Sequence, residues 1–238
     1  MVCRSPVSAA GVTNLLRLLN MGPSEIEKFL VEQYGREHLA FQTFTPVIVA
    51  WYLENLLDPE YANIFGGFPQ NVDAEGYLTF RTPIWGGDDR VPWISVADDL
   101  GDIVHGIFLN PRRWNGRLVQ GTGAISSFAD LVSKFVHGKR PVSIKPICFP
   151  LTQLAVTKRK CRYVPYPTVN DMPTHDISFI QQVRDLFAFT QLREGEYYCN
   201  GPTETLSAAS LKRASFLAKG GQGRESLLTI DEWLQRHF

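Results

Sequence analysis

The sequence predicts an α/β protein with a mainly parallel sheet and a second, smaller lobe. Two observations lead to this class: segments that read as strands alternate with segments of helical periodicity, and additional glycine- and proline-rich material separates them. The length of 238 residues, with 44% apolar and 20% charged side chains, is enough for one soluble domain that carries a small lobe.

Composition argues against several classes of partner. The 24 Lys and Arg residues balance 24 Asp and Glu residues, so the excess positive charge that nucleic-acid binding needs is missing. The longest apolar run, Val47 to Leu53, is far shorter than the ~20 residues of a membrane span, and no signal peptide is recognised. The four cysteines, at positions 3, 148, 161 and 199, include no CxxC pair, so we expect a reduced, cytoplasmic protein.

The N-terminal quarter predicts a helix, a strand and a second helix. Pro23 suits a first helical position, and apolar residues at helical spacing continue to a stop at Gly35. Residues 38–44 alternate apolar and polar side chains and predict a strand that ends at Thr45–Pro46, because proline cannot donate to a sheet ladder. The apolar, aromatic-rich segment from Val47 to Leu57 is then expected to be helical.

A loop-rich region precedes a well-marked strand and helix. Residues 64–90 are dense in glycine and proline and predict a short hairpin and a surface loop. A short strand then runs into a helix, at whose start Ser95 and Asp98 have the spacing of a capping box. The helix should end at Asn110–Pro111, because the residue before a proline is biased away from helical geometry.

The second half of the chain continues the alternation of strands and helices. A strand over Arg117–Gly121 leads to a helix that begins at a Ser127 cap. Residues 141–149 favour another strand, residues 150–175 a loop, and residues 177–189 a helix.

The final helix has the clearest start signal. Thr229 and Glu232 have the spacing and chemistry of a capping box. Leu228 and Trp233 stand where a hydrophobic staple places its two apolar residues.

Motifs of nucleotide chemistry are sparse. Glycine clusters at Gly121–Gly123 and Gly220–Gly223 read better as loops than as a phosphate-binding turn. No P-loop lysine, Tyr-x-x-x-Lys pair or G-x-S-x-G motif is found. Asp98, Asp99 and Asp102 fall in the first turn of a helix, where the macrodipole favours acidic residues without a catalytic role. The five histidines lack metal-ligand spacing, so we assign neither a metal site nor a catalytic residue.

Seven segments, taken in order, resemble the NmrA-like family, atypical relatives of the short-chain dehydrogenases. They read AAGVTNLLRL, SEIEKFLVEQ, FQTFTPVIVAWYLENL, VPWISVADDLGDIVHGIFLNPRRWNGRLVQGTG, SSFADLVSKFVHGKRPVSI, LFAFTQLREGEYYCNG and TIDEWLQRHF. No single segment is diagnostic, whereas the ordered set is specific and covers most of the chain. The resemblance implies a Rossmann-like sheet with a smaller C-terminal substrate lobe, the cofactor NAD(P), and small-molecule substrates, often in fungal secondary metabolism.

The resemblance also shows where this chain departs from the family pattern. Family members begin with a strand and a Gly-x-x-Gly-x-x-Gly turn for the dinucleotide, and this sequence has no counterpart of either. Pro23 falls where reductases of this type often show the lysine of SKxxIE. We therefore expect an incomplete sheet that lacks the N-terminal nucleotide-binding half. Its sheet-and-helix part would be residues 1–57 and 91–138, and its substrate lobe mainly residues 58–90 and 139–238.

The resemblance suggests which residues remain of a binding site. In related dehydrogenases the segment after the strand expected to end at Thr45–Pro46 lies beside the nicotinamide ring. The candidates for the cofactor side are therefore Thr45, Pro46 and Val47. The candidates for lining a substrate pocket are Trp51, Tyr52 and Trp85, and the alternative for these aromatic side chains is plain core.

Three functions stay open at this point. By kinship, the chain is an NAD(P)-dependent oxidoreductase that acts on a small hydrophobic metabolite, although fold kinship alone is a weak reason for a chemistry. The missing lysine and glycine turn favour a non-catalytic, redox-sensing regulator instead. A third reading is an inactive, truncated homologue, whose exposed sheet edge an oligomer or a protein partner would cover.

Overall fold

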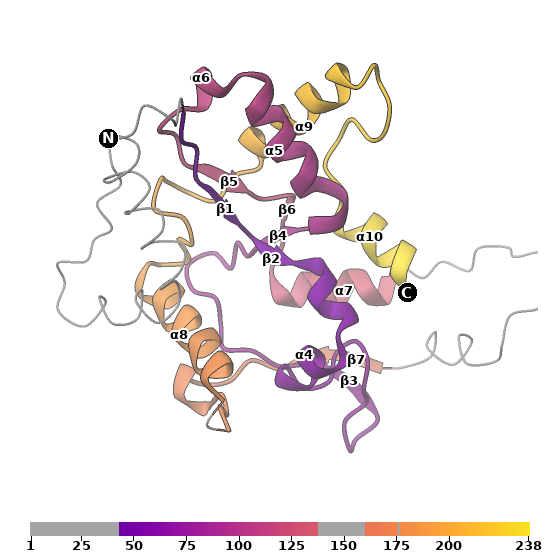
Figure 1. Cartoon of the computed structure of the whole chain (residues 1–238). Helices are drawn as coiled ribbons and strands as arrows, with labels where there is room; N and C mark the ends of the chain where they lie inside the picture. Colours follow the sequence, from indigo (N-terminus) through magenta and orange to yellow (C-terminus); the bar gives the residue numbers. More distant parts are fainter. Residues whose placement is uncertain (1–42, 138–159, 176) are drawn as a thin grey trace, which may run out of the picture.

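The computed structural model describes residues 43–137, 160–175 and 177–238 (Figure 1). The predicted helix between Pro23 and Gly35, most of the predicted strand at 38–44 and the predicted strand at 141–149 lie outside these residues.

Parallel pairing of short strands dominates the described sheets, as the sequence predicts. The parallel pairs are β1 (Val47–Val49) with β5 (Val119–Gly121), β2 (Trp51–Tyr52) with β4 (Pro92–Ile94), and β3 (Tyr77–Phe80) with β7 (Lys160–Tyr163). A short strand, β6 (Ala124–Ile125), pairs with β4 in the antiparallel direction.

Helices lie on both sides of these strands (Figure 1). In chain order they are η2 (Leu53–Leu57), α4 (Pro59–Ile64), η3 (Val96–Leu100), α5 (Gly101–Leu109), α6 (Pro111–Trp114), α7 (Phe128–His137), η5 (Val169–Asp171), α8 (Ser178–Leu192), α9 (Leu206–Ala218) and α10 (Ile230–His237). In Figure 1, α5, α6 and α9 lie above the strands β1, β4 and β5, and α4, α7 and the β3–β7 pair lie below them. The chain therefore builds the layered arrangement that an α/β sequence pattern predicts.

The segment from Val47 to Leu57 is not the predicted helix. It begins as β1, continues as β2 after one residue, and turns into the 3-10 helix η2 only at Leu53. The strand predicted to end at Thr45–Pro46 lies mostly outside the described residues, and a strand that was not predicted, β1, begins directly after Pro46. Pro46 lacks an N–H, but its carbonyl accepts a hydrogen bond from Val119 N at 2.9 Å, so proline is compatible with the start of a strand.

The region predicted as a hairpin and loops contains long-range pairing instead. Residues 77–80 form β3, whose partner β7 lies within the predicted loop at 150–175. Arg162 of β7 secures the pair, since its guanidinium contacts Asp73 and Glu75 at 2.7 and 2.8 Å. A strand pair made by residues so far apart leaves no local sequence signal, which explains why the predicted hairpin is wrong and why β7 was not predicted.

The predicted helix starts are confirmed in detail. Ser127 Oγ accepts a hydrogen bond from Asp130 N at 3.0 Å at the start of α7. Thr229 and Glu232 form the complete capping box of α10. α5 ends at Leu109, next to Asn110, as the Asn-Pro step predicts.

Two groups of buried apolar residues form the described core. The larger one is rich in aromatic rings and includes Trp51, Trp85, Trp93, Phe128 and Phe187. The smaller one is aliphatic and lies between β1, β5, α5 and α9; it comprises Ala50, Ile94, Ile103, Ile107, Val119, Ala208 and Leu211. Because each group combines strand residues from the first half of the chain with helix residues beyond position 180, burial of apolar surface ties the sheet to the C-terminal segment.

Candidate functional site

The carboxyl ends of β1 and β5 are the natural place for a ligand in this fold. Ligands of open parallel sheets bind in the crevice beyond the carboxyl ends of the strands. β1 ends at Val49 and β5 at Gly121, and these two residues stand opposite each other in the register. The next residue, Ala50, donates its N–H to the Gly121 carbonyl at 3.1 Å, so the two ends are held level.

Two consecutive tyrosines lie across these strand ends. The Tyr197 hydroxyl donates to the Val49 carbonyl at 3.3 Å, and the hydroxyls of Tyr198 and Thr122 lie 2.6 Å apart. The two rings meet edge to face with centroids 4.9 Å apart. The segment that follows α8 therefore lies against the carboxyl ends of both β1 and β5. Residue spacing in the sequence did not single out these tyrosines, because the contacts join residues about 75–150 positions apart.

The phenols of Tyr52 and Tyr61 lie near that of Tyr197, and Phe179 contacts Tyr61. Tyr52, at the end of β2, is 42% exposed, and Phe179 of α8 is 50% exposed. The rings of Phe179 and Tyr61 have centroids 6.4 Å apart. Burial and the neighbouring Tyr52 phenol raise the pKa of Tyr197 to about 12, so this phenol remains a hydrogen-bond donor at neutral pH.

The predicted cofactor-side residues lie at the opposite end of β1. Thr45 Oγ1 donates to the Trp114 carbonyl at 2.9 Å, and Pro46 accepts from Val119. Val47 packs against the aliphatic core group. These three residues were chosen because a strand was expected to end there; most of that strand lies outside the described residues, and contact of the three residues with a cofactor stays a prediction.

The predicted pocket residues have different environments. Trp51 and Trp85 are buried, with ring centroids 6.0 Å apart, and Trp85 Nε1 donates to the Gly195 carbonyl at 3.0 Å. Tyr52 faces outward. The burial of the two tryptophans agrees with the plain-core alternative, and a role in a pocket stays a prediction for all three.

Side chains of the protein take N–H groups at two of the described turns from strand to helix. At the start of η3, the Glu54 carboxylate accepts hydrogen bonds from Ser95 Oγ, Val96 N and Ala97 N at 2.7, 3.1 and 3.2 Å. At the start of α7, Ser127 Oγ takes a first-turn N–H. A pyrophosphate needs such N–H groups to be available, so neither turn fits the diphosphate of a dinucleotide.

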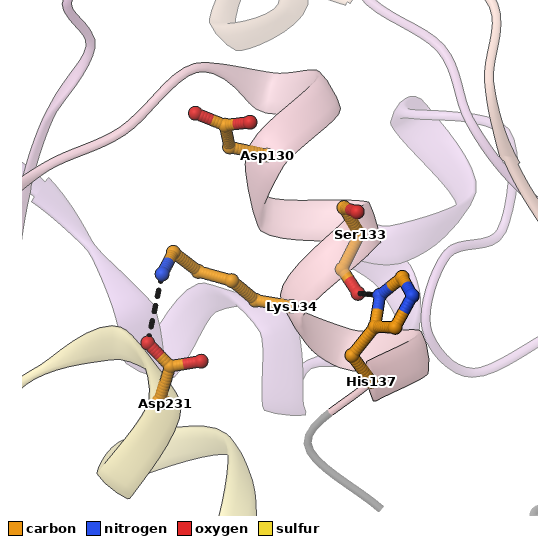
Figure 2. Close-up of a pocket in the computed structure, with 5 residues that line it drawn as sticks. All are labelled: Asp130, Ser133, Lys134, His137 and Asp231. Carbon is orange, nitrogen blue, oxygen red and sulfur yellow. Dashed lines mark hydrogen bonds and ion pairs between the residues drawn. The ribbon is translucent and has the colours of Figure 1, made fainter.

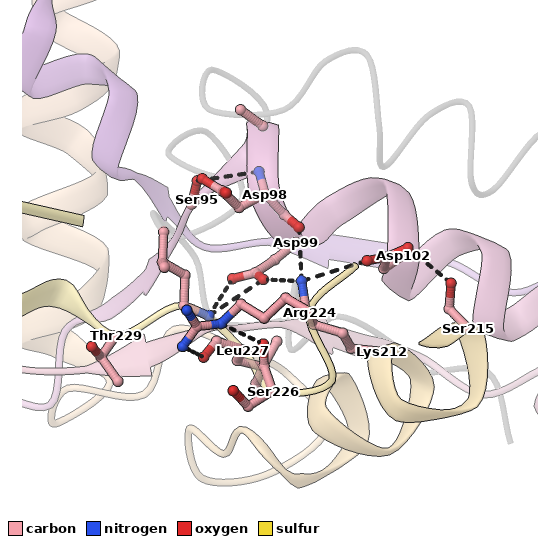
Figure 3. A network of polar contacts seen from close by, with 12 residues as sticks. Ser95, Asp98, Asp99, Asp102, Lys212, Ser215, Arg224, Ser226, Leu227 and Thr229 are labelled. Carbon is pink, nitrogen blue, oxygen red and sulfur yellow. Dashed lines mark hydrogen bonds and ion pairs between the residues drawn. The ribbon is translucent and has the colours of Figure 1, made fainter. Parts of the chain in front are cut away.

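A buried ion-pair network holds the start of the η3–α5 helix (Figure 3). Lys212 of α9 reaches Asp99 Oδ1 at 2.6 Å and Asp102 Oδ2 at 3.5 Å, and Asp99 also accepts the Leu228 N–H. Arg236 of α10 contacts Asp98 at 2.5 Å. The three carboxylates thus bind the C-terminal helices, which is a structural role as expected, although Asp99 is buried rather than placed on a solvated first turn.

A shallow polar pocket lies elsewhere, between α7 and α10 (Figure 2). Its volume is about 270 Å³, and it is lined by Asp130, Ser133, Lys134, His137 and Asp231. Lys134 Nζ lies 2.8 Å from Asp231, and His137 Nδ1 lies 2.7 Å from the Ser133 carbonyl. Lys134 is thus already paired with Asp231, and all five lining residues are polar, whereas ligand sites are lined mainly by hydrophobic and aromatic side chains.

Searches for two other features give negative results within the described ranges. Among residues 43–137, 160–175 and 177–238, no three His, Cys, Asp or Glu side chains gather in a way that would hold a metal ion. None of the helices in the same ranges has the length and apolar character required to cross a bilayer.

Comparison with known proteins agrees with this fold. No family model matches the chain. The oxidoreductase FrzB of Cladobotryum sp, named as an NmrA-like family domain-containing protein, is 42% identical over 92% of this chain and 61% of its own length. The similarly named lnaB of Aspergillus flavus is 42% identical over 87% of this chain and 58% of its own length.

Solved structures give the same result for the fold. NmrA, a negative transcriptional regulator, in complex with NAD matches with a TM-score of 0.52 at 19% identity, over 89% of this chain and 56% of that one. The described architecture is therefore an α/β arrangement of the Rossmann-like type. The chain belongs to the NmrA-like family, and it spans about three fifths of the length of the curated relatives it matches.

Proposed function

We propose that the chain works in an NAD(P)-dependent oxidoreductase that acts on a small hydrophobic metabolite, in fungal secondary metabolism. The observation that supports this most is the 42% identity, over 92% of the chain, to a relative named as an oxidoreductase. A cytoplasmic location goes with this proposal. So does the division into a sheet-and-helix part (1–57 and 91–138) and a substrate lobe (58–90 and 139–238).

The direction of the strands indicates how the described residues would take part. The reacting end of the cofactor would lie at the carboxyl ends of β1 and β5, rather than beside Thr45, Pro46 and Val47 at the amino end of β1. The described turns do not fit the pyrophosphate, so no reaction step is assigned to it. The residues around Tyr52 and Tyr197 would contact the substrate.

Cofactor binding tests the proposal directly. NADPH and NADH are titrated to millimolar concentration while the fluorescence of the five tryptophans is followed. A parallel titration of N-acetyltryptophanamide corrects for absorption of the exciting light by the cofactor. We expect a saturable change beyond that of the control. A change no larger than the control would overturn cofactor-dependent catalysis by this chain alone.

The position of the cofactor is tested by Thr45→Val and Val47→Ala. If the cofactor lies at the carboxyl ends, both variants bind NADPH as the wild type does. Weaker binding by several-fold in both would favour the amino end of β1 instead.

A second candidate is a non-catalytic regulator that senses the dinucleotide. It is favoured by the absence of a Tyr-x-x-x-Lys pair from the sequence. A stoichiometric protein partner in an affinity purification, together with NADPH binding but no NADPH oxidation over a panel of aromatic aldehydes and ketones, would support the regulator. NADPH oxidation with any of them would support the enzyme.

A further inference from the structure

We infer that Tyr197 is a substrate-binding residue, whose hydroxyl donates a hydrogen bond to a carbonyl oxygen on an aromatic metabolite, while the Tyr52 ring packs against that metabolite. This inference rests on the proposed function and names the chemical class of the substrate. The two residues are separated by 145 positions in the sequence (197 − 52), and the fold brings them together at the carboxyl ends of β1 and β2.

The position of Tyr197 carries the first part of the inference. Its hydroxyl reaches the Val49 carbonyl, the last backbone group of β1. That is the end of a parallel strand at which ligands of this fold class bind. Tyr197 is half-buried, and its ring lies beside Trp85 with centroids 5.8 Å apart, so packing fixes the position of the ring.

The hydroxyls of Tyr197 and Tyr198 differ in the length of their hydrogen bonds. The hydroxyls of Tyr198 and Thr122 lie 2.6 Å apart in a buried environment, which is a strong structural contact. The Tyr197 bond to Val49 is 3.3 Å long, well beyond the ~2.7–2.8 Å preferred by hydroxyl donors. A donor held so loosely can be redirected to a better acceptor at little cost.

The neighbouring side chains indicate an aromatic substrate. Tyr52 and Phe179 are 42% and 50% exposed, and Tyr61 lies next to Phe179. Aromatic rings prefer offset or edge-to-face contact with other rings. A flat ring on this side would therefore contact aromatic surface while its oxygen meets the Tyr197 hydroxyl.

Two isosteric probes separate the oxygen from the ring. Acetophenone carries a carbonyl, and α-methylstyrene has the same shape with a CH₂ group in place of the oxygen. Dissociation constants for both are measured by ligand-observed NMR on the full chain. We expect the wild type to bind acetophenone about two- to tenfold more tightly than α-methylstyrene, the ratio that one net hydrogen bond provides.

Three variants assign the preference to a residue. Tyr197→Phe keeps the ring and should bind both probes equally. Tyr198→Phe is the matched control, which should keep the preference but melt at a lower temperature, because it removes the buried contact with Thr122. Tyr52→Ala should weaken the binding of both probes by a similar factor, so the ratio of their dissociation constants should stay the same.

The outcomes are distinct from those of the cofactor titration. A preference that survives in Tyr197→Phe, or no binding of either probe to the wild type at millimolar concentration, overturns the inference. Either result leaves NADPH binding, and with it the proposed oxidoreductase, to be judged by the cofactor titration alone. Loss of the preference for acetophenone in both Tyr198→Phe and Tyr197→Phe would also contradict the assignment. The preference would then depend on the conformation of the segment that carries both tyrosines, and not on the Tyr197 hydroxyl.

Discussion

Lys212 of α9 and Asp99 of η3 form an ion pair with Nζ and Oδ1 2.6 Å apart and with side chains that are 1% and 0% exposed. Burial raises the pKa of Asp99, and the hydrogen bond from Lys212 opposes this effect. Such a pair costs desolvation free energy on both sides and is tolerated because each charge has the other as its partner. The pair fixes how the C-terminal helices dock on the start of η3–α5.

The first prediction concerns removal of one partner. Lys212→Met should lower the free energy of unfolding by about 3–5 kcal/mol, because it leaves a buried carboxylate without its counter-charge. Urea denaturation measures the change. The matched control is Lys134→Met, which breaks an ion pair with Asp231 whose side chains are 37% and 45% exposed and should cost about 0–1 kcal/mol.

The double variant Lys212→Met with Asp99→Asn sharpens this prediction. The neutral amide can still accept the Leu228 N–H, so part of the lost stability should return. Equal losses in Lys212→Met and Lys134→Met would contradict the described burial.

The second prediction concerns the crossing of α5 and α9. A Cβ on Gly106 would lie 2.3 Å from the Leu211 carbonyl oxygen, so Gly106→Ala should force the two helices apart and cost about 1–3 kcal/mol. Gly101, in the same helix, has nothing within 4 Å of the corresponding position. Gly101→Ala should stabilise the protein by roughly 0.5–1 kcal/mol, since alanine is the better helix former. Thermal unfolding of both variants checks the opposite signs.

A third prediction separates core from pocket for Trp85. Trp85→Phe removes the hydrogen bond to Gly195 and part of a buried ring, and should cost about 1–3 kcal/mol of stability. If Trp85 is core, the dissociation constant for acetophenone should stay unchanged. A variant of wild-type stability with altered probe binding would show that the pocket prediction is right.

The fourth prediction follows from the capping box of α10. Hydrogen bonds from Arg224 and Thr229 lower the pKa of Glu232 to about 2, from 4.5 in the unfolded chain. A depressed carboxyl pKa contributes stability above the unfolded value, and this contribution is lost as the pH falls from 4.5 towards about 2. Unfolding of wild type and Glu232→Gln should therefore differ most near pH 6 and converge near pH 2. A difference that is constant with pH would contradict the charge-based explanation.

Local signals predicted the boundaries of several helices. Ser127, Thr229 and Asn110 act within one turn of their own helix, so the residues that decide each boundary are adjacent in the sequence. The alternation of strands and helices predicted the class of the fold for a similar reason.

The strands around the site were harder to predict. β1 and β2 are short, and Pro46 before them suggested a strand end, whereas its carbonyl serves as an acceptor at a strand start. The tyrosines at 197 and 198 and the lysine at 212 acquire their roles from contacts across more than 70 positions. A single sequence carries no signal for such distant pairings, so these residues emerged only from the structure.

Ala50 alone separates β1 from β2, and its N–H is tied to Gly121. The end of β1 is therefore joined to the aromatic core around Trp51 by a single residue, whose backbone is itself held by a hydrogen bond. Trp51 is buried, so a change of its size should disturb the end of β1, whereas Tyr52 and Tyr197 are partly exposed and less constrained. Divergence in substrate choice within this lineage should accordingly accumulate at the latter two positions and leave the indole unaltered.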